Sequence, residues 1–179
     1  MLMRALRIGA DVLMPEQLAR LRSLVVTAIA QQRGRDTDLA AAALAAAHGW
    51  ADISARDAAH HTVIAARIHY RGGHYHSAAV LFGQALGRGE LPYPPEEIAV
   101  LYELLGRCLD AEQRYRAAAR AYAAGAAVIA DRAQWTELHA DLTGAAARSR
   151  QLARHPRATV REWERTSRPD GPPPVPGQR

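Results

Sequence analysis

Residues 73–86 read Gly-His-Tyr-His-Ser-Ala-Ala-Val-Leu-Phe-Gly-Gln-Ala-Leu, and residues 113–126 repeat the spacing of their aromatic and small residues. The equivalent positions are Tyr75 with Tyr115, Ala78 with Ala118, and Phe82 with Tyr122. Separations of three and four residues place side chains on one face of an α-helix. The two stretches therefore predict two copies of one helical unit.

Each unit extends over two helices when the residues before the second helix are included. The positions that form this repeat signature are Gly73, Tyr75, Ala78, Phe82 and Ala85 in the first unit, and Tyr102, Leu105, Gly106, Tyr115, Ala118 and Tyr122 in the second. An aromatic residue and Leu-Gly on one helix, followed by a small residue and an aromatic on the next, are typical of tetratricopeptide repeats. The copies are about 40 residues apart rather than about 34, and we assign the extra length to the loop at 88–95.

The small residues of the signature explain why two helices can pair closely. We expect Gly106, Ala78 and Ala118 to lie where the helices of each hairpin cross, because a larger side chain would push the helices apart. Phe82 and Tyr122, one turn later, would fill the space beside the crossing. The alternative is an irregular helical bundle, in which alanine and tyrosine match by composition alone.

The rest of the chain also reads as helix, with no segment that alternates with the period of a strand. We expect helices at 2–13, 15–31, 38–47 (stopped by Gly49), about 54–70, 75–86, 95–110, 113–130 and 132–153. The predicted fold is all-α, an antiparallel helix-hairpin array of tetratricopeptide type. The helices at 2–13, 15–31 and 132–153 would act as caps, since two repeats alone leave their flanks uncovered. The array would span residues 1–153, and residues 154–179 would form a basic, Pro-rich disordered tail.

The composition of the chain limits its cellular location and its possible disulfide bonds. The chain has 179 residues, a net charge of +5 and no lysine, so all 23 basic side chains are arginine. Its single cysteine, Cys108, excludes an internal disulfide. No apolar run reaches the length of a membrane span, and Arg7 interrupts any signal peptide. We expect an intracellular protein without a membrane partner.

An apolar stripe on the helix at 15–31 is the candidate self-association surface. It is formed by Leu18, Leu21, Leu24, Val25 and Ile29. A second chain could cover this stripe, giving a homodimer. Packing against the chain's own second repeat is the alternative, and the spacing does not separate the two.

The order of these parts resembles the N-terminal region of the repeat-containing subunits of the anaphase-promoting complex, most closely subunit 7. The resemblance rests on the first repeat, the loop that leads into Pro95-Glu96-Glu97-Ile98, and the second repeat from Tyr102. It implies a homodimeric scaffold, stacked with other repeat subunits inside a nuclear ubiquitin ligase of the cell cycle. Members of that family continue through many more repeats. The alternatives are therefore a truncated or divergent form of such a subunit and an unrelated repeat adaptor in the cytoplasm.

Other features give weaker hypotheses. His60, His61, His69, His74 and His76 are close in sequence, but zinc needs three or four converging ligands, so we expect no metal. No nucleophile elbow, phosphate loop or dinucleotide fingerprint is present, so we expect neither catalysis nor a cofactor.

A groove including His69 and Tyr102 could hold a partner peptide. The Arg-rich stretch at 148–168 is the candidate for a rival function, nucleic-acid binding through phosphates.

Overall fold

The computed structural model describes residues 12–32, 34–89 and 91–154, and these residues form helices and turns without any strand. The helices are α2 (Pro15–Gln31), α3 (Asp36–Trp50), α4 (Ala55–Arg71), α5 (Tyr75–Gly87), α6 (Pro95–Ala111), α7 (Tyr115–Val128), the 3₁₀ helix η1 (Ala133–Trp135) and α8 (Thr136–Arg154). The all-α prediction is confirmed. The helix predicted at 2–13 and most of the predicted tail lie outside the described residues.

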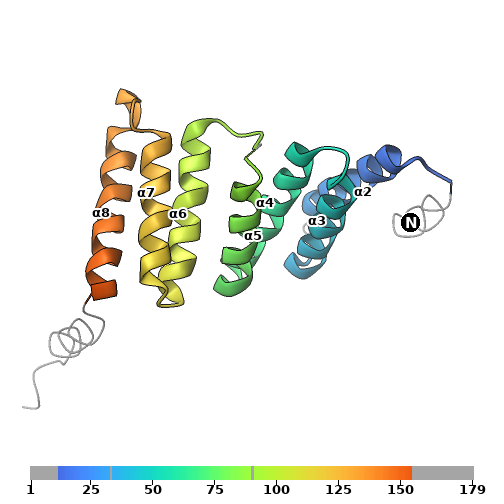
Figure 1. Ribbon diagram of the computed structural model, residues 1–179. Helices are drawn as coiled ribbons and strands as arrows, with labels where there is room; N and C mark the ends of the chain where they lie inside the picture. The colour runs from blue at the N-terminus through green and yellow to red at the C-terminus, as the bar shows by residue number, and fades with distance from the viewer. Residues whose placement is uncertain (1–11, 33, 90, 155–179) are drawn as a thin grey trace, which may run out of the picture.

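The helices stand side by side in chain order, from α2 at one end to α8 at the other (Figure 1). Each helix packs against the next one in the sequence. The contact of α5 with α6 joins the two predicted repeats, and α3 lies between α2 and α4. The described part of the protein is therefore a row of helices, in which most contacts join neighbours along the chain.

Local sequence signals explain where the helices begin. Pro15 and Pro95 occupy the first turns of α2 and α6, where proline's missing N–H costs no hydrogen bond. The Ser54 side chain accepts a hydrogen bond from the Asp57 backbone N–H at 3.2 Å, which caps α4.

The turn between α4 and α5 is repeated between α6 and α7. Gly73 has φ +75°, and Gln113, 40 positions later, has φ +59°. The backbone hydrogen bonds match as well: the N–H of His74 donates to the His69 carbonyl and that of Arg114 to the Leu109 carbonyl, both at 2.9 Å. Two stretches of different sequence thus form the same turn, although only the first has the glycine that this conformation favours.

The prediction that Gly49 ends its helix is wrong, because α3 continues to Trp50. A Cβ at position 49 would lie 2.8 Å from Nη1 of Arg22 and 3.5 Å from Cα of Ala19. Gly49 therefore allows α2 to approach α3 closely. The buried Trp50 side chain anchors the last turn of the helix, so the terminating effect of glycine does not prevail.

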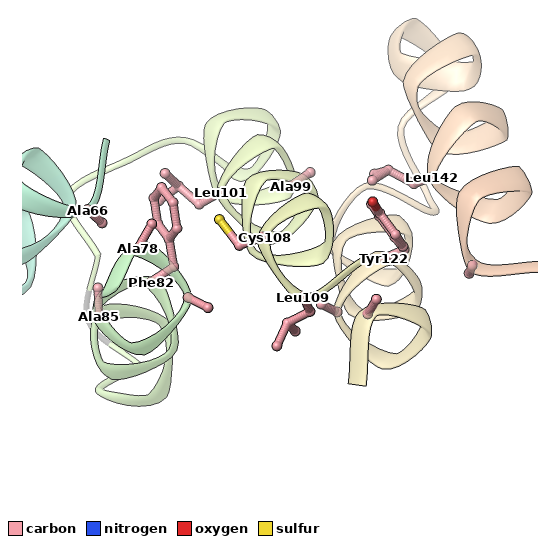
Figure 2. Packing of buried hydrophobic residues seen from close by; sticks show 14 of the residues in the cluster. Ala66, Ala78, Phe82, Ala85, Ala99, Leu101, Cys108, Leu109, Tyr122 and Leu142 are labelled. Atoms are coloured by element: carbon pink, nitrogen blue, oxygen red, sulfur yellow. The ribbon is translucent and has the colours of Figure 1, made fainter. Parts of the chain in front are cut away.

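The main buried cluster extends from α4 to α8 and contains many alanines. Figure 2 labels several of its residues, including Ala66, Phe82 and Cys108. The aromatic ring of Phe82 lies among small residues between α4, α5 and α6. Two smaller clusters join α2 and α3 to α4; one contains Val26 and the other Trp50. Small side chains allow close packing of the helices along the row.

Candidate protein-binding surfaces

The repeat signature forms the interior of the protein rather than a surface. Ala78, Phe82 and Ala85 are fully buried in the first unit. In the second unit a Cβ at Gly106 would lie 2.5 Å from the ring of Tyr122, so α6 and α7 cross where no side chain intervenes. Ala118 is also fully buried beside this crossing. The small residues lie where the sequence places the crossing.

The other signature residues lie nearer to the surface. Tyr102, Leu105 and Tyr115 are partly buried, and Tyr75 is 40% exposed. The ring of Tyr75 lies against that of Tyr70, with centroids 5.9 Å apart. These residues cover the edges of the core, so the signature does not form one contiguous exposed site.

A network of side-chain hydrogen bonds connects α6, α7 and α8. The Asp110 carboxylate accepts hydrogen bonds from the Tyr122 hydroxyl at 3.0 Å and from the Ser149 hydroxyl at 2.9 Å. Burial, together with the nearby Asp110 carboxylate, raises the pKa of Tyr122. Sequence reasoning missed Asp110 and Ser149, because they are 39 positions apart and neither belongs to the repeat signature.

The predicted self-association stripe does not form a single exposed face. Val25 is only 3% exposed, whereas the neighbouring Leu24 is 63% exposed. Leu18, Leu21 and Ile29 are partly buried. Successive helical residues point about 100° apart, which explains why Leu24 and Val25 cannot share a face. The chain's own α3, rather than its second repeat, is the helix that packs against α2.

An apolar groove of about 530 Å³ lies between α2 and α3. Val25 and Ile29 of the predicted stripe line one side. The other lining residues are Arg22, Gln32, Gly34, Asp38, Ala41, Ala42 and Ala45. An apolar interior with a few polar groups at its margin suits protein or ligand binding. The alanines of α3 carried no recognisable binding signal in the sequence.

A polar network of Ser23, Trp50 and His61 connects α2, α3 and α4. Trp50 Nε1 donates to Ser23 Oγ at 2.9 Å, and His61 Nε2 lies 2.7 Å from the same oxygen. With the proton on Nε2, His61 also donates to Ser23 Oγ, which leaves the serine hydroxyl to donate to the Ala19 carbonyl at 3.2 Å. The buried Nδ1 of His61 has no hydrogen-bond partner among the described residues.

The histidines have separate environments. Burial lowers the pKa of both His60 and His61, and each of the two has a Ser or Tyr hydroxyl as its neighbour. His76 instead lies 2.9 Å from Glu112 of the next repeat. Within residues 12–32, 34–89 and 91–154, no three His, Cys, Asp or Glu side chains are grouped closely enough to hold a metal ion.

A small hollow lies beside α6, one of the helices to which we assigned the predicted peptide groove. This hollow of about 180 Å³ lies between α6 and α8, and its charged lining residues are Glu103, Arg107, Asp141 and Arg148. His69 and Tyr102 are not among its lining residues. His69 instead lies beside His74, with ring centroids 5.9 Å apart. The structure therefore does not bring the two predicted groove residues together here.

The buried Cys108 shows no sign of a reactive thiol. Burial raises its pKa to about 11, so the thiol remains protonated at neutral pH.

Among the described helices, none is long and apolar enough to cross a membrane.

Comparisons with known proteins do not assign the chain to a family. No protein family, curated protein or solved structure matches the sequence or the fold significantly. The proposals below accordingly rest on the packing and surfaces of this chain.

Proposed function

We propose that this chain is a non-catalytic protein scaffold, a helix-hairpin array of tetratricopeptide type that associates with itself through the groove between α2 and α3. The observation that carries the proposal is this apolar groove at the first end of the described row of helices. Its surface is formed by aliphatic side chains of two helices, with Arg22 and Asp38 at its margin.

The repeated turn supports the tetratricopeptide part of the proposal. Gly73 and Gln113 have the same left-handed conformation at an offset of 40 positions, and the hydrogen bonds around them correspond. The same offset relates the buried Ala78 to Ala118 and Phe82 to Tyr122. An agreement of backbone conformation, burial and residue type at one offset is expected for two copies of a structural unit, and not for an irregular bundle.

The position of the groove supports self-association. The groove is lined on α2 by Val25 and Ile29 and on α3 by Ala41, Ala42 and Ala45, of which Ala41 and Ala45 are exposed. A second copy could present the same surface, since a two-fold interface brings identical patches together. Arg22 of one copy could then pair with Asp38 of the other, because both line the groove.

Replacing groove alanines by glutamate tests self-association. Ala41 and Ala45 are exposed, so A41E and A45E place charges in the groove without filling the core. We expect the wild-type chain to be a dimer by light scattering and both variants to be monomers. The matched control is A140E, at an exposed alanine of α8. A monomeric wild type, or a dimer unaffected by A41E and A45E, would contradict this interface.

Membership of a larger assembly, such as the anaphase-promoting complex, is the narrower form of the proposal. It rests on the sequence resemblance and is tested by gentle purification of the tagged chain from its own cells, followed by mass spectrometry. Co-purified repeat subunits of a ubiquitin ligase would support it. A different set of proteins would leave only the general scaffold function.

A further inference from the structure

Two overlapping grooves between α7 and α8 carry a concentration of positive charge. Their volumes are about 500 and 410 Å³, and they share Arg116, Arg120 and Ala153. The first is also lined by Gln113, Arg114, Tyr115 and Ala117, and the second by Ala119, Ala123, Arg150 and Arg154. Among the described residues no acidic side chain lines either groove, so the charged side chains that line them are all positive.

The arginines form two rows. Arg116 and Arg120 are one turn apart on α7, and Arg150 and Arg154 are one turn apart on α8. Residues four apart are neighbours on a helix surface, about 6 Å apart along its axis. Both rows border alanines that lie in the same grooves. The partly exposed alanines that line the grooves with the arginines are Ala117, Ala123 and Ala153.

This arrangement differs from the other arginine pairs of the protein. Arg20 pairs with Glu16, and Arg107 pairs with Glu103, each at 2.6 Å and each across one helical turn. In the part of the chain that the structure describes, Arg116, Arg120, Arg150 and Arg154 make no ion pair. Like charges one turn apart repel each other, so these rows disfavour their own helices. A bound anion would offset that repulsion.

We propose that these grooves bind an acidic, partly aliphatic segment of a partner protein. Guanidinium groups form paired hydrogen bonds with carboxylates, and aliphatic side chains of the segment would contact the partly exposed alanines of the grooves. The spacing of about 6 Å within a row matches carboxylates one turn apart on a helix, or two residues apart on an extended strand. The proposal rests on the scaffold function above and specifies the chemistry of one partner.

The partly exposed alanines favour a protein segment over a nucleic acid. A phosphate backbone could pair with the arginines, but it has no aliphatic groups to place on the partly exposed Ala117, Ala123 and Ala153. Of the described residues that line these two grooves, Tyr115 is the one aromatic, whereas single-stranded nucleic acids are bound by several aromatic side chains on which successive bases stack.

Fluorescence anisotropy with the full chain tests the proposal. The probes are a labelled synthetic helical peptide with Glu at every fourth position and Leu directly before each Glu, a Gln–Leu peptide of the same length and spacing, and a labelled DNA duplex. The groove variant is R120Q/R150Q, and the control is R56Q/R88Q, which removes the same charge from exposed positions outside the grooves. Melting curves check that both variants are folded.

We expect the Glu–Leu peptide to bind, the groove variant to weaken its binding at least about tenfold, and the control to have a much smaller effect because distant charges are screened. Absence of Glu–Leu binding, equal loss in both variants, or tighter binding of the Gln–Leu peptide or the DNA would overturn the proposal. Light scattering on the same samples reports self-association at the other end of the protein. A wild-type chain that forms the dimer but does not bind the Glu–Leu peptide therefore contradicts this inference alone.

Discussion

At the scale of single residues, side-chain size decides how the helices cross. Gly106 leaves the space that the Tyr122 ring occupies, and Gly49 leaves space for the side chain of Arg22. Gly83 has nothing within 4 Å of the position of a Cβ. Glycine is thus required at position 106, where a Cβ would meet the Tyr122 ring, and replaceable at position 83, where it would meet nothing.

The substitution G106A tests the crossing of α6 and α7. The added methyl group would meet the Tyr122 ring, and we expect a loss of about 1–3 kcal/mol in the free energy of unfolding. G83A is the matched control and should gain up to about 1 kcal/mol, because alanine favours the helix. Urea unfolding measures both values. Equal effects of the two substitutions would mean that α6 and α7 do not cross at Gly106.

The turn at Gln113 leads to a second prediction at this scale. Gln113 has φ +59°, a conformation that costs a residue with a side chain about 1 kcal/mol more than glycine. We expect Q113G to stabilise the protein by up to about that amount in urea unfolding. The control Q134G replaces an exposed residue of η1, where φ is not positive, and should not stabilise. A destabilised Q113G variant would contradict the assigned turn.

At the scale of elements, polar networks fix which helices pack together. Asp110 joins α6 to α7 and α8 through two hydroxyl groups, while Ser23 joins α2 to α3 and α4 through Trp50 and His61. Buried polar groups are costly unless they are paired, so each network favours one arrangement of its helices over slipped alternatives.

The network around His61 makes stability depend on pH. Burial lowers the pKa of His61 and of its neighbour His60 below 6.5, so the unfolded chain binds protons more readily than the folded chain. The contribution of these histidines to stability should be constant above about pH 7 and fall as the pH drops below 6.5 towards the lowered values. Urea unfolding at several pH values measures this dependence.

The variant H61Q separates the contribution of this residue. It should reduce the loss of stability between pH 7 and pH 5.5, although its stability at neutral pH will be lower because the contact with Ser23 changes. The control H48Q alters an exposed histidine at the end of α3 and should retain the wild-type pH dependence. An unchanged dependence in H61Q would show that His61 does not cause it.

At the scale of the whole molecule, the row of helices distributes stability unevenly. The main buried cluster extends from α4 to α8, whereas α2 and α3 depend on two small clusters. In linear arrays the local stability follows from each unit and its neighbours. Such a protein can open at one end while the remainder stays folded.

Hydrogen exchange should reveal this difference. We expect the amides of α6 and α7 to exchange slowest and those of α2 and α3 faster, because fewer large side chains are buried around the first two helices. Mass spectrometry of peptic fragments resolves the individual helices. The A41E variant serves as the control, since a dimer interface would itself protect α2 and α3. Equal protection of all helices in that variant would contradict the prediction.

The sequence by itself determined the helices, the positions of the signature residues and the cap at Ser54, because these depend on periodicity and on the backbone preferences of proline, serine and alanine. The tertiary structure alone decided that Gly49 lies inside a helix, that Leu24 and Val25 face different environments, and that Asp110 meets Ser149. It also brought the arginines of α7 and α8 together in one groove. These features depend on which helix faces lie opposite each other, and that is set by the packing of residues distant in the sequence.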